Sequence, residues 1–336
     1  MYTKVMDSME ALLGKNDSII EPSDYNFRIS FIAASTNVDE KVENSIYSIS
    51  RIAEELGRDF EIILTTPFKS TLKSMARILL MRENCSQFQL NVEDFSSPGR
   101  GKQISFEKSS GKYVVPFNPE VSYPVEFSDI LHSFLKFKLK RLFYSELPLI
   151  SSEIVKEVGG WRDLLIGEDL DLFARISMNY GTLAMPSDLM PGTGYGIEDT
   201  ICLSRIFTFN SLPYKRKMEY VRDLIISCNL SFRETNNISS LLSEYEGFRI
   251  RGISALAQIM KHFYPVKPVN YDRNNLTVFM ESVLESLVLK EFQRLGDVSS
   301  HVHLNIHRVL LKFLQKNSNL YREMSNSLSL YVTPEY

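Results

Sequence analysis

Two short apolar runs near the start of the chain, separated by a segment of helical period, indicate a strand, a helix and a second strand. The runs at 27–34 and 60–66 are rich in strand formers and lack polar alternation, which is typical of strands buried on both faces. Between them, apolar side chains recur at helical spacing from Val42 to Leu56, and Gly57 suits the end of a helix. This order predicts a βαβ unit with parallel strands.

The same alternation of helical and strand-like segments continues as far as residue 118. The segments that carry it are a helix at 70–84, a strand at 86–93, a Gly-flanked basic turn with a helix at 96–112, and a strand at 113–118. Sheets built from such repeats are parallel, are covered by helices, and bind ligands beyond the carboxyl ends of their strands. The sequence therefore predicts an α/β fold with a Rossmann-like, mostly parallel sheet flanked by helices.

After Met185 the pattern changes to a loop-rich stretch and then to helices. Residues 186–200 are rich in proline and glycine, and the amphipathic segments at 274–296 and 301–316 predict helices. Three parts are therefore expected along the chain: a lead-in helix and linker at 1–25, an α/β domain at 26–197, and a helical C-terminal domain at 198–336.

Composition and charge are those of an ordinary globular protein. Of the 336 residues, 44 % are hydrophobic and 24 % are charged, and the net charge of −3 gives no reason to expect nucleic acid as a partner. Three widely spaced cysteines argue against a disulfide framework and fit a reducing compartment. The sequence has no run of about 18 apolar residues and no apolar signal core at its start. We therefore expect a cytoplasmic protein, associated at most with the cytoplasmic face of a membrane.

An acidic cluster follows a Gly-Gly-Trp turn within the segment Ser151–Arg175. Glu168, Asp169 and Asp171 fall in the first turn of an amphipathic helix, where the helix dipole favours negative charge. A carboxylate pair on such a rigid helix start can abstract a proton or bind a metal. The preference of helix starts for negative charge accounts for the cluster equally well, so the residues upstream decide between the two interpretations.

Four segments, in this order, resemble the family 2 glycosyltransferases of the GT-A fold over roughly residues 27–185. ISFIAASTN is similar to the first strand and nucleotide loop, and FEIILTT to the second strand. GRGKQISFEKSSGKYVVPFN is similar to the turn, helix and strand before the metal motif, and VGGWRDLLIGEDLDLFAR to the acidic segment. The resemblance implies inverting transfer of a sugar from a UDP- or GDP-linked donor to a sugar, a lipid-linked glycan or a protein. Asp169 would be the base, with Glu168 beside it.

The resemblance also assigns binding residues. The donor-binding residues are Ala34, Ser35, Asn37, Thr66, Gly99, Arg100, Gly101, Lys102 and Asn118. Gly160 and Trp161 fall on the acceptor side, where Trp161 is either a platform for a sugar ring or a packing residue. Asn118 and Glu120 stand at the position of the Mg²⁺ or Mn²⁺ motif. The basic, Gly-rich turn at 99–102 offers N–H groups and cations that suit a diphosphate.

Two positions depart from the family pattern. Where the family has an Asp that contacts the base, this chain has Thr66, which can bind a base or ribose or simply end a strand. In place of Asp-x-Asp stands Asn118-Pro119-Glu120, which offers one charge fewer to a divalent cation or forms a surface turn. Three hypotheses follow: an active transferase with an altered donor site, a metal-independent transferase, or a non-catalytic relative that acts in binding or assembly.

Two further segments have alternative interpretations. Residues 132–144 alternate basic and apolar side chains, which suits a lipid-linked or anionic acceptor or a membrane surface, or else an amphipathic element with a solvated lysine face. His301, His303 and His307 have no Cys, Asp or Glu at a metal-site spacing, which favours a polar helix start. The C-terminal helices can cap the acceptor site, form a homodimer or contact a membrane.

Overall fold

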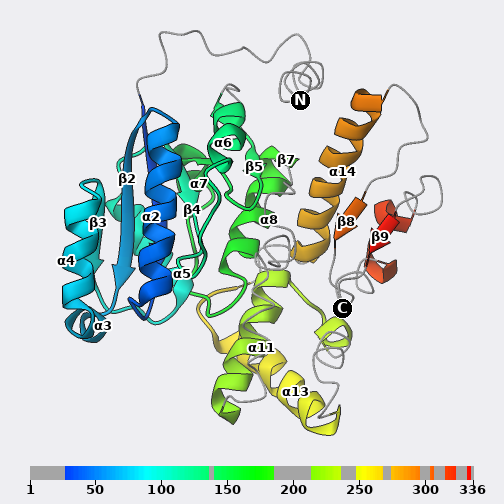
Figure 1. The fold of residues 1–336 in the computed structure, drawn as a ribbon. Helices are drawn as coiled ribbons and strands as arrows, with labels where there is room; N and C mark the ends of the chain where they lie inside the picture. The colour runs from blue at the N-terminus through cyan, green and yellow to red at the C-terminus, as the bar shows by residue number, and fades with distance from the viewer. Residues whose placement is uncertain are drawn as a thin grey trace. The chain divides into compact units, whose positions relative to one another are not determined.

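The computed structural model describes residues 27–135, 140–184, 213–235, 247–267, 274–295, 303–305, 315–322 and 331–333 (Figure 1). The chain forms two compact units. One contains Lys15–Asp163 and Leu183–Thr193, and the other contains Met1–Gly14, Leu164–Thr182 and Gly194–Tyr336. The expected lead-in helix at 1–25 and the expected boundary at 197–198 lie outside the described residues, so both stay predictions.

A five-stranded sheet with the order β3-β2-β1-β4-β6 forms the centre of the first unit. Its strands are β1 (Arg28–Ala34), β2 (Asp59–Thr66), β3 (Phe88–Val92), β4 (Tyr113–Pro116) and β6 (Ile150–Ser151). β1 pairs in parallel with β2 and β4, β2 pairs in parallel with β3, and the short β6 pairs antiparallel with β4. The predicted α/β class with a mostly parallel sheet is therefore confirmed, and its register sets Ala34 opposite Thr65 at the carboxyl edge.

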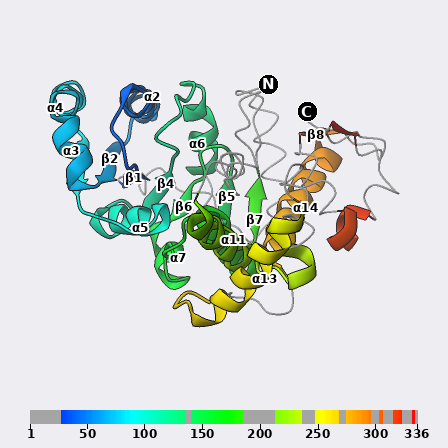
Figure 2. The same ribbon diagram turned by 90° about the horizontal axis from the view of Figure 1, so that it is seen from below.

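Helices cover both faces of this sheet, as predicted. They are α2 (Glu40–Glu55), α3 (Phe68–Lys73), α4 (Met75–Asn84), α5 (Pro98–Lys108), α6 (Phe127–Leu135) and α7 (Ser152–Glu157). Figure 2 shows α2 and α4 on one face and α5 on the other. Asp39 caps α2 by accepting the N–H groups of Lys41 and Val42 at 3.1 and 3.2 Å. Beyond its last turn, Gly57 adopts the left-handed φ of 60° that favours glycine.

The single helix expected at 70–84 is divided into α3 and α4. Ser74 separates them with φ −117° and ψ 17°, outside the helical region, and its N–H donates to the Thr71 carbonyl at 3.2 Å. The sequence did not reveal this break because apolar residues keep a helical spacing on both sides of it. The division leaves two short helices, each of which carries exposed apolar residues.

The second unit contains α8 (Glu168–Tyr180), α11 (Tyr214–Cys228), α13 (Gly247–Phe263) and α14 (Asn275–Leu295). α8 packs against α11 and α14, with the rings of Phe173 and Phe279 6.1 Å apart. α11 and α13 share an apolar core that includes Ile225 and Ile253. The acidic helix therefore packs with C-terminal helices, whereas the sequence placed it in the α/β domain. None of the described helices is long and apolar enough to cross a bilayer.

The prediction of a helix at 301–316 is wrong for the first residues of this segment that the structure describes. His303–Asn305 form β8, which pairs in parallel with β9 (Tyr331–Thr333). The partner strand lies far along the chain, so local periodicity did not reveal the pairing. His301 and His307 lie outside the described residues. Another small sheet joins β5 (Leu142–Tyr144) and β7 (Thr182–Ala184).

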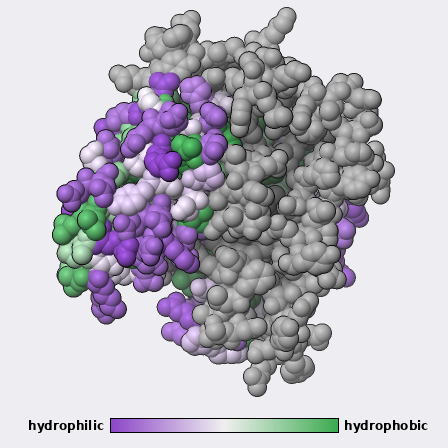
Figure 3. Space-filling view, in the orientation of Figure 1, coloured by the Kyte–Doolittle hydropathy of each residue, from purple (hydrophilic) through white to green (hydrophobic). Residues whose placement is uncertain are grey.

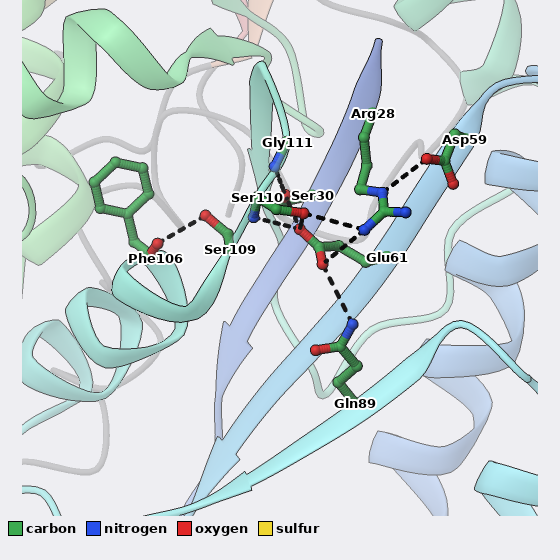
Figure 4. A network of polar contacts seen from close by, with 9 residues as sticks. All are labelled: Arg28, Ser30, Asp59, Glu61, Gln89, Phe106, Ser109, Ser110 and Gly111. Carbon is green, nitrogen blue, oxygen red and sulfur yellow. Dashed lines mark hydrogen bonds and ion pairs between the residues drawn. The ribbon is translucent and has the colours of Figure 1, made fainter.

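A buried carboxylate ties strand starts together at the amino edge of the main sheet (Figure 4). Glu61, which is 3 % exposed, accepts hydrogen bonds from the Ser30 hydroxyl at 2.6 Å and from the Ser110 N–H and hydroxyl at 2.6 and 3.0 Å. Gln89 donates to its other oxygen at 3.3 Å, and Arg28 lies 3.9 Å away. These residues come from β1, β2, β3 and the segment before β4, so one carboxylate links the starts of four strands.

Candidate functional site

The loop after β1 meets the end of β2 at the carboxyl edge of the sheet. The Ser35 N–H donates to the Thr65 carbonyl at 3.0 Å. The Ser35 hydroxyl donates to the Asn37 carbonyl at 2.6 Å and accepts the Asn37 N–H at 3.3 Å. The structure therefore brings the predicted residues Ala34, Ser35 and Asn37 to the end of β2. The hydrogen bonds of Ser35 fix the loop, and Asn37 is exposed.

Two adjacent threonines at the end of β2 differ in their hydrogen bonds. Thr65 Oγ1 lies 2.6 Å from Ser105 Oγ, which donates to the Ala33 carbonyl at 2.8 Å. Thr66 is fully buried and its carbonyl accepts the Glu93 N–H, but its hydroxyl has no partner among the residues that the structure describes. A buried hydroxyl without a partner costs roughly 1–3 kcal/mol. Thr66 is therefore a polar group whose burial no described residue compensates, and a ligand can reach its hydroxyl only if the side chains that cover it move.

The basic segment Gly99–Lys102 lies inside α5, so the prediction of a turn before the helix is wrong. Pro98 takes the first helical position, where its missing N–H has no helical partner to lose. The Ser97 hydroxyl accepts the Arg100 N–H at 3.1 Å, and the Ser97 carbonyl accepts the Gly101 N–H at 3.0 Å. Two of the N–H groups expected to hold a diphosphate are therefore already bonded.

Gly101 serves the packing of α5 against β1. A Cβ at this position would lie 2.6 Å from the Ala34 Cβ and 3.3 Å from the Phe95 ring, so a side chain there would push the helix away from the strand. Lys102 is 6 % exposed, whereas the Arg100 side chain is 43 % exposed. Of the two cations in this segment, Arg100 is the one that a ligand can reach.

The segment from Asn118 to Glu120 forms a turn after β4. Asn118 Oδ1 accepts the Glu120 N–H at 3.0 Å, and the Asn118 carbonyl accepts the Val121 N–H at 3.3 Å and the Ser45 hydroxyl at 3.2 Å. Hard divalent cations prefer several oxygen ligands, ideally charged. Within the described residues, no three His, Cys, Asp or Glu side chains gather as metal ligands. The Asn118 amide oxygen is therefore used within the turn, which leaves the Glu120 carboxylate as the acidic group of this pair, and the Mg²⁺ or Mn²⁺ site implied by the resemblance stays a prediction.

The three carboxylates at the start of α8 have different surroundings. Asp171 is fully buried and forms an ion pair with Arg175 at 2.8 Å, so its charge is used within the helix. Glu168 is also fully buried, whereas Asp169 is partly exposed. Of the predicted acidic pair, Asp169 is therefore the member that an acceptor hydroxyl can approach.

The chain just before α8 is anchored to α11. The Leu165 N–H donates to Asp223 Oδ2 at 2.7 Å, and Asp223 is buried beside Arg222, also at 2.7 Å. Gly167 has a left-handed φ of 70°, and a Cβ there would lie 2.5 Å from Ser227 Oγ. Both the conformation and the close approach require glycine at this position. The acidic helix start is therefore held rigidly within its own unit.

Trp161 is a packing residue, which settles one of the alternatives left by the sequence. Its side chain lies against Phe106, with the ring centroids 5.8 Å apart, and the residue is only 3 % exposed. Its N–H donates to Gln103 Oε1 at 2.8 Å, and a Cβ on Gly160 would lie 2.1 Å from the same oxygen. No sugar can stack on a ring with this burial. Gln103 was missed from the sequence because glutamine on a helix carries no local signal.

The basic and apolar segment at 132–144 is divided between core and surface. Phe134 and Phe143 are buried, with their rings 5.0 Å apart. Lys140 is exposed and ion-paired. Residues 136–139 lie outside the described residues. The described aromatic residues of this segment therefore pack in the core, and the membrane interpretation does not apply to them.

In comparisons with known proteins, the chain is similar only to solved structures. No protein-family model and no curated protein matches the sequence. The chain is similar to the Pyrobaculum calidifontis mannosyltransferase PcManGT in complex with GDP-Man and Mn²⁺, at 11 % identity and a TM-score of 0.45. The similarity covers 96 % of this chain and 89 % of that chain.

Two other similar structures come from bacteria. S. aureus TarS 1-349 in complex with UDP-GlcNAc is 11 % identical with a TM-score of 0.40, over 79 % of this chain and 81 % of that chain. M. tuberculosis glucosyl-3-phosphoglycerate synthase is 12 % identical with a TM-score of 0.38, over 69 % of this chain and 86 % of that chain. At these identities and TM-scores the likeness does not assign an activity to the chain.

Proposed function

We propose that this chain is a glycosyltransferase that moves a sugar from a UDP- or GDP-linked donor to an acceptor hydroxyl. The observation that carries the proposal is the buried Thr66 hydroxyl, which has no partner within the described residues, at the carboxyl edge of a parallel sheet. Open α/β sheets bind ligands at this edge. The sequence resemblance puts the nucleotide at the end of the second strand. Because the Thr66 hydroxyl is fully buried, a ribose or base atom would become its partner only after the covering side chains move.

Asp169 is assigned the role of base. The acceptor hydroxyl gives its proton to the Asp169 carboxylate while its oxygen bonds to the anomeric carbon of the sugar. The bond from that carbon to the diphosphate oxygen breaks, and the nucleoside diphosphate leaves with the electron pair. The partial exposure of Asp169 and the rigid anchor before α8 support this role. A positioned base of this kind contributes about 10²–10⁴-fold to a rate.

Arg100 is assigned to the leaving diphosphate. Its side chain is exposed and lies 3.6 Å from the Glu107 carboxylate, so a diphosphate would take the place of this exposed ion pair. Cationic groups stabilise the charge that develops on a departing phosphate. Asn118 and Glu120 remain the proposed position of a divalent cation, and no step of the transfer is assigned to that cation.

Nucleotide binding tests the donor site. Calorimetry with UDP and with GDP would compare the wild type with Thr66→Val, which keeps the shape of the side chain and removes the hydroxyl. We expect roughly tenfold weaker binding, the loss of about one hydrogen bond. Thr65→Val is the matched control, because that hydroxyl is bonded to Ser105 and its loss leaves nucleotide affinity unchanged. If the wild type binds neither nucleotide, or Thr66→Val binds as tightly as the wild type, the donor site is wrong.

Turnover tests the base. With a panel of UDP- and GDP-sugars, Asp169→Asn should lower release of the nucleoside diphosphate by about 10²–10⁴-fold and leave nucleotide binding intact. Asp129→Asn is the control, since Asp129 is likewise an aspartate in the first turn of a helix, α6, and is exposed. Equal loss in both variants would show an effect of helix charge and would contradict the assignment of Asp169.

A non-catalytic binding or assembly protein is the second candidate function. The turn at Asn118–Glu120 favours it, because this position offers the donor's cation a single carboxylate and an amide oxygen that already accepts the Glu120 N–H. Nucleotide binding without release from any sugar donor would support this candidate over the transferase. The cytoplasmic location and the homodimer stay predictions.

A further inference from the structure

Exposed apolar side chains gather on α3 and α4, which lie in sequence between the edge strand β3 and its neighbour β2. Five large residues are each 45–57 % exposed: Phe68, Leu72, Met75, Leu79 and Leu80. Figure 3 shows a green, hydrophobic group at the left margin, in the region where Figure 1 draws α3 and α4. Phe68 and Leu72 are four residues apart on α3, as are Met75 and Leu79 on α4, so each pair shares a helix face. We call these five residues the α3–α4 surface.

Positive charges accompany this apolar surface. α3 and α4 together carry four cations and one acid: Lys69, Lys73, Arg77, Arg82 and Glu83. Arg77 forms an ion pair with Glu43 of α2. Lys69, Lys73 and Arg82 are exposed to solvent. The two helices are therefore locally basic in a chain whose net charge is −3.

We propose that the α3–α4 surface docks on a membrane that contains anionic lipids. Helices that lie in a membrane interface bury Phe and Leu side chains below the headgroups and keep Lys and Arg at headgroup level. The α3–α4 surface has this pattern, and its lysines and Arg82 are complementary to negatively charged lipid. No membrane-spanning helix is needed for such docking.

The charge pattern favours a lipid surface over a second copy of this chain. In a two-fold symmetric dimer the same patch faces itself, so Lys69, Lys73 and Arg82 of both copies would be brought into one interface. Like charges held together across an interface oppose association. An anionic membrane covers the same apolar residues and neutralises the cations. The proposal needs only this surface, so it stands apart from the transferase activity and from the residues assigned to it.

Vesicle flotation tests the proposal with the full chain. The probes are vesicles of phosphatidylcholine alone and of phosphatidylcholine with about 30 % phosphatidylserine. We expect the wild type to float with the anionic vesicles, to bind the neutral ones less, and to be released as salt is raised. The pair Lys69→Gln and Lys73→Gln should weaken binding to anionic vesicles by about fivefold per lysine.

Apolar variants supply the second arm. Leu72→Ser with Leu79→Ser should lower the vesicle-bound fraction by more than about tenfold, because two exposed leucines no longer enter the interface. The matched control is Leu256→Ser with Ile259→Ser on α13, two residues that are also exposed, at 43 % and 57 %. That control should float like the wild type. Circular dichroism and urea unfolding check that each variant is folded.

Several results would overturn the proposal. One is a wild type that does not bind anionic vesicles at low salt. Another is equal loss of binding in the α3–α4 pair and in the α13 pair. A third is light scattering that shows a dimer which Leu72→Ser with Leu79→Ser turns into a monomer, without vesicle binding by the wild type; the surface would then join two copies of the chain.

Discussion

The buried polar groups at the two edges of the main sheet differ in their hydrogen bonds. At the amino edge, the carboxylate of Glu61 accepts hydrogen bonds from Ser30, Ser110 and Gln89 (Figure 4). At the carboxyl edge, Thr66 is buried just as deeply, yet its hydroxyl has no partner within the described part of the chain. Both residues belong to β2, so neither burial nor the strand itself explains the difference.

The difference indicates which edge holds the fold and which edge is available to a ligand. A buried charge is tolerated only when hydrogen bonds and charges compensate it, and Glu61 has them. A buried hydroxyl without a partner is a local cost that needs an explanation, and a ligand site is one such explanation. We therefore assign stability of the fold to the amino edge and ligand binding to the carboxyl edge. Mutations at each edge can test these two assignments.

The largest effect is expected at Glu61. Glu61→Ala leaves the Ser110 N–H and the Ser30 hydroxyl without their acceptor, and we expect a loss of about 3–5 kcal/mol in the free energy of unfolding. The midpoint of urea unfolding measures it. Asp59→Ala is the control on the same strand, because its ion pair with Arg28 is exposed and should change the midpoint little. A small effect at Glu61 would remove the contrast between the edges.

The next largest change in the free energy of unfolding is expected at Gly101, because this residue sets the distance between α5 and the carboxyl end of β1. Gly101→Ala places a Cβ 2.6 Å from Ala34, and such overpacking costs about 1–3 kcal/mol. Gly252→Ala in α13 is the matched control, since nothing lies within 4 Å of a Cβ there. Alanine favours a helix over glycine by up to about 1 kcal/mol, so the control should be stabilised. Urea unfolding that showed stabilisation in both variants would contradict the close approach.

Much of the fold could be predicted from local periodicity. The strand at 27–34 and the helix that ends at Gly57 are where the spacing of apolar residues puts them. Features set by contacts distant in sequence could not be predicted. The break at Ser74 and the strand at His303–Asn305 belong to this class, since only the folded chain shows what they pair with or pack against.

The sequence predicted where the residues of the candidate site lie in strands and helices, but not which side chains surround them. The sequence placed Thr66 at the end of a strand and Asp169 at the start of a helix, and the structure agrees. It did not show that Thr66 lacks a partner or that Trp161 is buried, because both depend on which side chains surround them. The Glu61 network was missed for the same reason, since its donors come from separate strands and loops.

Thr65 tests whether a satisfied hydroxyl beside Thr66 contributes stability. Thr65→Val removes the contact with Ser105 and the long bond that Asn91 Nδ2 donates at 3.4 Å, while Ser105 keeps its bond to the Ala33 carbonyl. We expect a loss of about 1 kcal/mol in the free energy of unfolding, the usual contribution of one hydrogen bond. Urea unfolding is the measurement. Ser86→Ala is the control, because its exposed hydroxyl bonds only the neighbouring Gln87 side chain, and an equal loss there would deny Thr65 a special role.

Thr66→Val is expected to have the smallest effect on stability, and with the opposite sign. Valine keeps the shape of threonine and removes a buried hydroxyl whose desolvation no described residue compensates. We therefore expect a gain of up to about 1 kcal/mol in the free energy of unfolding, measured by urea. The same change should weaken binding of UDP or GDP. A loss of stability would show that the hydroxyl already has a partner and that the two edges do not differ. A gain in stability together with unchanged nucleotide binding would support the difference between the two edges but would contradict a ligand site at the carboxyl edge.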